Sequence, residues 1–298
     1  MDSCHLVDVY SATRSIALVT AIFFVTGCSA GSVQPGVKLI TTPPPAAVLT
    51  NLPTASPIPL EGTIQSALSS LIKSPELGDH VGVAVGDALT GTMIYQSDSA
   101  SPNDQFIPAS TIKLFTTAAV LNINKPDERV TFKGKIVSLS DLVETTLTES
   151  DNSGANFLLK LLPVSIELAL GTSLPTLDLR QTTVVDGSGL SRKNRTTPST
   201  LVHLLMLIAD PKRPELTPIL SGLPISGVDG TLKNRAAAVR GQIRAKTGTL
   251  TGVDVLAGYV VDSAKRALAF AVMVDHAPRT GPARKKIDEI ATALVKLS

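Results

Sequence analysis

The sequence predicts an α+β fold, in which strands from both ends of the chain form one antiparallel sheet flanked by helices, with a helical subdomain inserted in the middle. Strand-like segments occur within residues 80–95 and again within 242–274, whereas the pattern from 109 to 209 is mostly helical. Helix-like stretches, 61–73 and 282–297, lie outside these segments. With 298 residues, 43% of them hydrophobic, the chain is long enough to bury a large core.

The first 27 residues have the pattern of a signal peptide. The apolar run 15–26 is too short to span a bilayer comfortably and has the length of a signal hydrophobic region. It ends in Val25-Thr-Gly-Cys28, which resembles a bacterial lipobox and implies cleavage before Cys28 and lipid attachment to it. A plain secretory peptide or a short anchor is the alternative. Cys4 lies in the removed part, so the mature chain is expected to hold no disulfide.

Residues 28–59 are predicted to be a tether. From Gly31 to Pro59 the chain is rich in Pro, Thr, Ala and Ser and has no hydrophobic periodicity, which is typical of an extended linker. Residues 60–298 are then a single folded domain, which the tether is expected to hold away from a membrane surface in the cell envelope.

The elements of that domain follow from local patterns. Period-two alternation and a Thr90-Gly91 turn predict a hairpin near the start, and Pro108 marks the start of a long apolar helix. The predicted segments, in chain order, are a helix at 61–73, strands at 80–87 and 92–95, helices from 109 and at 139–147, strands at 242–247, 253–261 and 266–274, and a helix at 282–297.

Composition excludes several functions. The formal net charge is only +2 and aromatic residues make up 3% of the chain, so a basic stripe or a base-stacking platform for nucleic acid is not expected. His80, His203 and His276 lack the spacing of metal ligands, and no metal or cofactor is predicted. The sequence has no Gly-x-Ser-x-Gly elbow, which argues against a Ser-His-Asp hydrolase.

Ser110 and Lys113 are the first candidate catalytic pair. They lie three residues apart, and so on one face of a helix, at the start of a run that is apolar almost all round. Burial lowers the pKa of a lysine, and a neutral lysine can accept a serine proton. A second Ser-x-x-Lys, Ser70 to Lys73, ends its helix before Ser74-Pro75, so its lysine is expected to be solvated.

Two further motifs follow at fitting places. Ser150-Asp-Asn152 comes after a helix-like stretch, where a loop enters the next helix, and Lys246-Thr-Gly248 ends a strand-like segment. Each motif is weak alone, because a Ser-x-x-Lys is expected about once by chance in a chain of this length. All three in this order are a strong signal for the serine acyl-transfer enzymes that include class A β-lactamases and penicillin-binding proteins, for which the set is already documented.

The chain resembles the serine D-alanyl-D-alanine carboxypeptidases/endopeptidases among the low-molecular-mass penicillin-binding proteins. Three further stretches carry the resemblance, from 76 to 85, from 186 to 191 and from 223 to 232. The resemblance implies an enzyme of peptidoglycan maturation that removes the terminal D-Ala of stem peptides and that β-lactams inhibit covalently. It implies no cofactor.

The resemblance also implies roles for the motif residues. Ser110 is the nucleophile, Lys113 its base, and Ser150 and Lys246 return the proton to the leaving group, while Asn152 orients Lys113 and the substrate amide. The backbone N–H groups of Ser110 and Thr249 are expected to form the oxyanion hole. The substrate-binding stretch on the strand is Thr247, Gly248 and Thr249, and the resemblance implies that Thr247, with Thr249 as a second candidate, binds the substrate carboxylate with the aid of Lys246.

The chain departs from this family in one large way and leaves one residue open. Family members usually carry long extra domains between the first two motifs, but here only residues 114–149 separate them. Asp186 lies where a β-lactamase holds a deacylating carboxylate, yet Asp186-Gly-Ser-Gly is also typical of a rigid turn. A β-lactamase and a catalytically inactive wall-binding lipoprotein on the same fold remain the alternatives.

Overall fold

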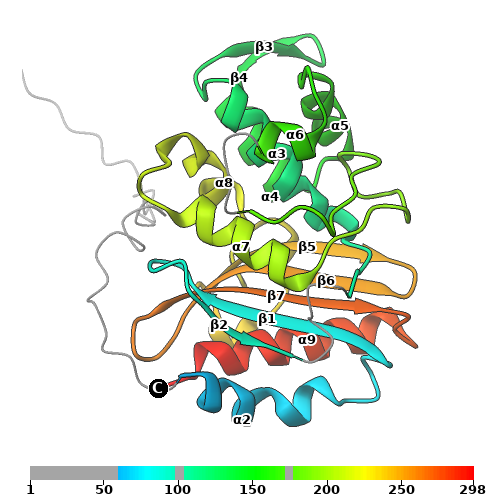
Figure 1. Ribbon diagram of the computed structural model, residues 1–298, viewed down its shortest axis with the longest axis vertical. Coiled ribbons are helices and arrows are strands. Elements are labelled where there is room, and N and C mark those ends of the chain that lie inside the picture. Colours follow the sequence, from blue (N-terminus) through cyan, green and yellow to red (C-terminus); the bar gives the residue numbers. More distant parts are fainter. Residues whose placement is uncertain (1–59, 98–103, 172–176) are drawn as a thin grey trace, which may run out of the picture. The chain divides into compact units, whose positions relative to one another are not determined.

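A computed structural model describes residues 60–97, 104–171 and 177–298 (Figure 1). The predicted signal segment, tether and lipid-attachment residue Cys28 lie outside the described residues. None of the described helices is long and apolar enough to cross a membrane.

The centre of the domain is a five-stranded antiparallel sheet with the order β2-β1-β7-β6-β5. The strands are β1 (His80–Asp87), β2 (Met93–Gln96), β5 (Ile243–Leu250), β6 (Val253–Val261) and β7 (Ala267–Asp275). Strand β1 pairs with β7 along its whole length, from His80 opposite Asp275 to Asp87 opposite Leu268. The prediction that strands from both ends of the chain share one sheet is therefore confirmed.

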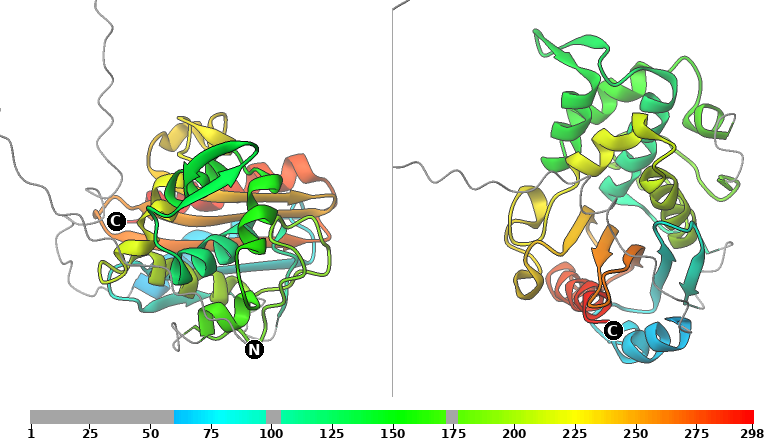
Figure 2. Two further views of the ribbon diagram at one scale, coloured as in Figure 1. Left: turned by 90° about the horizontal axis from the view of Figure 1, so that it is seen from above. Right: turned by 90° about the vertical axis from the view of Figure 1, so that its left-hand side faces the viewer.

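Helices cover both faces of the sheet. Helices α2 (Leu60–Ile72) and α9 (Thr280–Val295) lie on one face, and the helical subdomain lies on the other (Figures 1 and 2). Strand β7 is buried throughout and alternates between the two cores: Phe270 and Val272 pack towards α2 and α9, whereas Ala271 and Met273 belong to the core beneath the helical subdomain. This double burial makes β7 an almost continuous apolar run.

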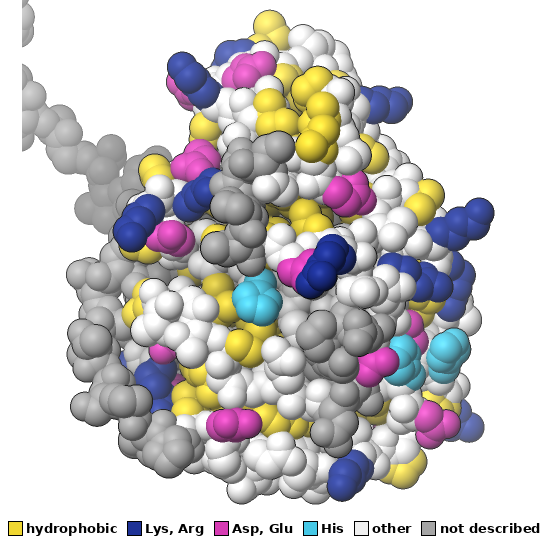
Figure 3. Space-filling model, viewed as in Figure 1, with side chains coloured by type: hydrophobic (Ala, Val, Ile, Leu, Met, Phe, Trp, Pro, Cys, Tyr) yellow, Lys and Arg dark blue, Asp and Glu magenta, His cyan; other side chains and the backbone are white. Residues whose placement is uncertain are grey.

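The helical subdomain lies between β2 and β5 in the chain. Its α-helices are α3 (Ile112–Ile123), α4 (Leu139–Thr148), α5 (Asn152–Lys160), α6 (Ile166–Gly171), α7 (Pro198–Ala209) and α8 (Thr217–Gly222). Short 3₁₀ turns are η2 (Ala109–Thr111), η3 (Pro214–Leu216), η4 (Gly230–Leu232) and η5 (Ala237–Val239). On the face seen in Figure 3, basic and acidic side chains are interspersed, and hydrophobic side chains show in the upper part, over this subdomain.

The middle of the chain is less helical than predicted. A two-stranded hairpin, β3 (Arg129–Phe132) and β4 (Lys135–Ser138), separates α3 from α4. Its turn residues Lys133 and Gly134 both have positive φ, 50° and 76°, as a type I′ turn requires. The hairpin escaped prediction because Lys-Gly is a weaker turn signal than Asn-Gly.

The strand that carries the third motif is longer than predicted. The prediction ended it at 247, but β5 continues to Leu250 and pairs with β6 through Lys246-Thr-Gly248 and beyond. The motif therefore lies within a regular strand at the edge of the sheet, which fixes the direction of its side chains.

The loop before α7 packs against the start of the Ser110 segment. Gly189 has φ of 90°, and a Cβ built on it would lie 2.0 Å from the carbonyl oxygen of Ala109. Ala109 itself has φ of 44°. Two backbone segments with positive φ thus meet here without an intervening side chain, and only glycine fits at position 189.

We expect Gly189→Ala to destabilise the protein by about 2 kcal/mol or more, because the new methyl group meets backbone that has no room to move and the alanine must keep a positive φ. Chemical denaturation measures the loss. Gly281→Ala is the control, because its Cβ meets nothing within 4 Å and it lies in helix α9. The control should be neutral or up to about 1 kcal/mol stabilising. Equal stabilities of the two variants would contradict the expectation.

Candidate active site

The three motifs meet where the edge strand β5 faces the helical subdomain. Ser110 lies in η2, Lys113 in the first turn of α3, Ser150 between α4 and α5, Asn152 at the start of α5, and Lys246 in β5. Hydrogen bonds join them in two groups, Ser110–Lys113–Asn152 and Ser150–Lys246. The two groups are close enough for the charge of Lys113 to lower the pKa of Lys246, so the five residues predicted to be catalytic lie together.

Lys113 is fully buried and its amine has three oxygen neighbours. The Nζ atom lies 3.1 Å from Ser110 Oγ, 2.8 Å from Asn152 Oδ1 and 2.5 Å from the carbonyl oxygen of Ser188. Burial lowers the pKa of Lys113 to about 8, although Asp186 and Asp151 oppose the shift. About a tenth of the amine is therefore neutral at pH 7, far more than for an ordinary lysine.

The partners of Lys113 direct its lone pair. A neutral amine has two N–H groups and one lone pair, and the oxygens of Asn152 and Ser188 can only accept hydrogen bonds. Those two acceptors take both N–H groups. In the structure Lys113 Nζ donates to Ser110 Oγ, and the Ser110 hydroxyl donates to the Ser188 carbonyl oxygen at 3.4 Å. Once the amine is neutral and its two N–H groups bind Asn152 and Ser188, its lone pair is left to face Ser110 Oγ, as a general base requires.

Asn152 is held in place by the geometry of the preceding loop. Ser150 has φ of 56°, an unusual value for a residue with a side chain, and the Asp151 side chain accepts a hydrogen bond from Ser153 N at 2.8 Å to cap α5. Lys133 from the β3–β4 hairpin also binds Asp151, at 2.9 Å. Asp151 therefore fixes the start of the helix on which Asn152 is the first residue.

Lys246 is also fully buried. Its Nζ atom donates hydrogen bonds to Ser150 Oγ at 2.9 Å and to the Thr247 carbonyl at 3.0 Å. Burial lowers its pKa well below the ordinary lysine value, and the nearby charge of Lys113 adds to the effect. The site thus holds two amines and a hydroxyl that can exchange protons.

Gly248 brings strand β5 against the backbone of Ser110. A Cβ built on it would lie 2.8 Å from the Pro108 carbonyl and 3.2 Å from Ser110 N. The absence of a side chain allows the β5 backbone to pass directly beside the Ser110 backbone. An oxyanion hole made of the N–H groups of Ser110 and Thr249 needs such an approach and stays a prediction.

The two threonines of the strand have different surroundings. Thr247 is nearly buried and its hydroxyl hydrogen-bonds Thr231 Oγ1 at 2.8 Å, whereas Thr249 is exposed and its hydroxyl donates to Asp254 Oδ1 at 3.0 Å. Thr231 lies within 223–232, one of the stretches that carry the family resemblance, but no local pattern indicates its contact with Thr247.

Asp186 serves the rigid turn that its sequence suggested. One carboxylate oxygen accepts hydrogen bonds from the N and Oγ of Ser188 and from Gly189 N, and the other from Ser191 N and Asn194 Nδ2. Burial acts to raise the pKa of Asp186, but these hydrogen bonds outweigh it and the pKa is lowered. The carboxylate is thus fully engaged in shaping the loop that presents the Ser188 carbonyl to Lys113.

The segment that precedes Ser110 is held to the central sheet by side-chain contacts. The buried Asp275 side chain, at the end of β7, accepts a hydrogen bond from Ile107 N at 3.1 Å. His80 lies 3.8 Å from Asp275 and stacks on Phe106 with 3.9 Å between ring centroids. These contacts tie the segment before Ser110 to the centre of the sheet, a link that no local sequence pattern indicates.

The second Ser-x-x-Lys is far from this chemistry. Ser70 and Lys73 are both exposed, at and after the end of α2 on the opposite side of the sheet. Among the residues that the structure describes, no group of three His, Cys, Asp or Glu side chains could hold a metal ion.

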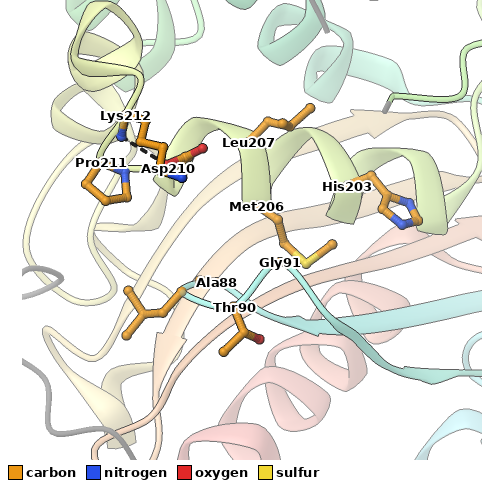
Figure 4. A pocket seen from close by; sticks show the side chains of 10 residues that line it. Ala88, Thr90, Gly91, His203, Met206, Leu207, Asp210, Pro211 and Lys212 are labelled. Carbon is orange, nitrogen blue, oxygen red and sulfur yellow. Dashed lines mark hydrogen bonds between the residues drawn. The ribbon is translucent and has the colours of Figure 1, made fainter. Parts of the chain in front are cut away.

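A cavity of about 440 Å³ lies away from the motifs, between the β1–β2 turn and the end of α7 (Figure 4). His203, Asp210 and Lys212 are its ionisable lining residues. His203 Nδ1 pairs with the Ser199 carbonyl at 2.9 Å, and Asp210 accepts a hydrogen bond from Lys212 N. None of the predicted site residues lines this cavity.

Comparison with known proteins agrees with the geometry. The model of the D-Ala-D-Ala carboxypeptidase 3 (S13) family matches residues 64–138 and 124–294, together more than half of the chain. The two matches overlap at 124–138, the stretch that contains the β3–β4 hairpin.

Individual relatives are matched over part of their length. Carboxypeptidase DacB of Mycolicibacterium smegmatis is 38% identical over 173 residues, which are 52% of this chain and 37% of that protein. D-alanyl-D-alanine carboxypeptidase DacB of Haemophilus influenzae is 31% identical over 153 residues, 46% of this chain and 32% of that protein. The chain spans less than half of the length of these relatives.

Solved structures show the fold. A class A β-lactamase from Bacteroides cellulosilyticus has a TM-score of 0.62 at 19% identity, covering 80% of this chain and 98% of its own. A β-lactamase from Sphaerobacter thermophilus has a TM-score of 0.61 at 21% identity, covering 77% and 95%. By its family match, the chain belongs to the D-Ala-D-Ala carboxypeptidase 3 (S13) family.

Proposed function

We propose that this protein is a serine D-alanyl-D-alanine carboxypeptidase that removes the terminal D-Ala from peptidoglycan stem peptides through an acyl-enzyme on Ser110. The observation that carries the proposal is the buried Lys113 amine, 3.1 Å from Ser110 Oγ, with both of its other partners able only to accept hydrogen bonds. Membership of the S13 family supports the same reaction.

The reaction begins with transfer of the Ser110 proton to Lys113 as Oγ attacks the carbonyl carbon of the last peptide bond. The backbone N–H groups of Ser110 and Thr249 stabilise the oxyanion. Ser150 and Lys246 relay that proton from Lys113 to the departing nitrogen, and the C–N bond breaks to release D-alanine. Water then attacks the ester, Ser110 recovers its proton, and the shortened peptide leaves. Endopeptidase cleavage of crosslinks would use the same steps.

The engaged state of Asp186 favours a penicillin-sensitive peptidase over a β-lactamase. All the hydrogen bonds that it accepts come from its own loop, and these lower its pKa, so it is poorly suited to activate water on a penicilloyl ester. We therefore expect β-lactams to acylate Ser110 and remain attached.

The first test measures D-alanine release from a diacetylated Lys-D-Ala-D-Ala peptide together with labelling by a fluorescent penicillin. Wild-type protein should release D-alanine and keep the label, and Ser110→Ala should lose both, because the nucleophile is gone. Ser70→Ala is the matched control, since Ser70 has the same spacing to a lysine but is exposed on α2, and it should behave as wild type. Rapid penicillin turnover without D-alanine release would identify a β-lactamase, and neither activity would identify an inactive wall-binding protein.

The second test is the pH dependence of Ser110 acylation. The neutral form of Lys113 is the base, and its fraction rises with pH, so the acylation rate should rise through a pKa of about 8 and then level off. Below that pKa, the rate should fall about tenfold for each pH unit. Lys113→Arg keeps a cation but cannot give up its proton in this range, and should be slow at every pH. A flat wild-type profile across neutral and mildly alkaline pH would refute this role for Lys113.

Export and anchoring belong to the same proposal. Peptidoglycan lies outside the cytoplasmic membrane, and the pattern of residues 1–27 with the lipobox-like Val25-Thr-Gly-Cys28 supports export, cleavage and lipidation of Cys28. The Pro/Thr-rich tether at 28–59 then gives the catalytic domain reach to its substrate.

We expect Cys28→Ser to abolish incorporation of labelled palmitate and to move the protein from the membrane fraction to the soluble or secreted fraction. Stable membrane binding needs more than one acyl chain, because a single chain binds only marginally. Cys28→Ser removes the whole lipid modification, so the variant should no longer be held at the membrane. The control is Cys4→Ser, which should leave label and fractionation unchanged. Membrane association of Cys28→Ser without any label would instead indicate that the first 27 residues remain as an anchor.

A further inference from the structure

A buried carboxylate on strand β6 and an arginine on helix α9 meet at the exposed end of strand β5, beyond Gly248. Asp254 of β6 is 2% exposed and stands opposite Thr249 in the β5–β6 register. Arg284 of α9 approaches both residues: its Nη2 atom donates to Thr249 Oγ1 at 3.4 Å, and its Nε atom lies 3.6 Å from Asp254 Oδ1. The three side chains form a cluster next to Lys246-Thr-Gly248 that the proposed reaction does not use.

Within this cluster the Thr249 hydroxyl already donates its proton to Asp254, so it cannot donate that proton to a substrate. A hydroxyl has a single proton to donate, and that of Thr249 goes to Asp254 Oδ1 at 3.0 Å. Towards an approaching carboxylate, Thr249 Oγ1 therefore offers lone pairs, which repel it. If an anion binds at this end of β5, another group must supply the hydrogen bonds.

Arg284 can supply them, because most of its donors are uncommitted. A guanidinium carries five N–H groups in a planar fork and stays charged. The Arg284 side chain is 40% exposed. Its Nε atom, like Asp254 Oδ2, is buried without a hydrogen-bond partner, so the donors that can meet a ligand are those of its Nη atoms, beyond the bond from Nη2 to Thr249. A nearby arginine shows what a fully paired guanidinium looks like. Arg235 binds Asp288, which lies on α9 like Arg284, through both Nε and Nη2, at 3.2 and 2.8 Å.

The position of Arg284 fits the chemistry of a C-terminal residue. Gly248 lies against Ser110 N, and Thr249, which Arg284 touches, is the next residue along the strand. In a substrate whose last peptide bond is attacked by Ser110, the terminal carboxylate lies one residue, about 3.8 Å in Cα spacing, beyond the scissile bond. Lys246 is fully buried and bound to Ser150, so it is a poor partner for a solvated carboxylate.

We propose that Arg284 binds the C-terminal carboxylate of the substrate, and so determines specificity for a free carboxyl end, while Asp254 positions Arg284 and Thr249. The inference rests on the proposed peptidase function and deepens it. In this proposal Arg284 contributes to substrate binding, whereas Lys113 and Ser150 transfer protons during the reaction.

The test compares a fluorescent penicillin, whose carboxylate is free, with its methyl ester. The measured quantity is the second-order rate constant for acylation of Ser110 in the full-length chain. A charge-assisted hydrogen bond lost from the transition state lowers that constant about tenfold to a hundredfold, so Arg284→Gln should show this loss with the acid and less than about a twofold change with the ester. Arg284→Lys, which keeps the charge but not the fork, should fall between Arg284→Gln and wild type.

Lys285→Gln is the matched control, because it removes the same charge from the neighbouring, exposed position of α9 and should leave both rates unchanged. Because Arg284→Gln leaves Asp254 buried without a cation, the double variant Asp254→Asn with Arg284→Gln repeats the comparison with the charge balance restored. Equal loss with acid and ester, or no loss with either, would overturn the role of Arg284. Failure of wild-type protein to be acylated by the free acid would instead overturn the proposed function.

Discussion

The burial of two lysine amines between a helix and a sheet edge is the constraint on which the site depends. Lys113 and Lys246 are both fully buried, and each stands beside a serine hydroxyl. An ordinary lysine holds its proton far too tightly at neutral pH to take one from serine. Burial removes the solvation that stabilises the ammonium, and the two charges disfavour each other, so the fold itself lowers the pKa of both amines. The apolar surroundings of α3 are therefore part of the chemistry.

Close backbone contacts make that burial possible. Gly248 lets β5 pass beside Ser110, and Gly189 lets the Asp186 loop close over Ala109 from the other side. On the sheet, Gly82 admits Phe106 and Pro198, whose atoms would lie within 2.9 Å of a Cβ built at that position. The nucleophile segment is thus enclosed by strand, loop and helix without intervening side chains. A small displacement of any of these layers would admit water to Lys113 and restore its ordinary pKa.

The sequence predicts the parts of this arrangement that local patterns encode. The pairing of N-terminal and C-terminal strands follows from alternation, and the five catalytic candidates follow from three short motifs. The role of the Ser188 carbonyl could not be predicted, because a backbone acceptor leaves no trace in residue type. The Asp275–Ile107 contact joins positions far apart in the chain, and only the completed sheet brings them together. The two possible roles of Asp186 were separable only once its five hydrogen bonds were known.

The shortness of the connection between the first two motifs has a structural explanation. A hairpin returns the chain to the point where it left, so β3 and β4 link α3 to α4 while taking no part in the main sheet. The Lys133–Asp151 contact joins exposed side chains and contributes at most about 1 kcal/mol. Asp151 caps α5 by itself, so the second motif does not need the hairpin to keep its shape. The resemblance places longer domains at this point of the chain in relatives, whereas here the hairpin alone joins the two helices and the hydrogen bonds among the motif residues are still formed. What such domains can change is the wall around the substrate, so in this chain the contacts that select a substrate must come from the sheet edge, the Asp186 loop and the start of α9.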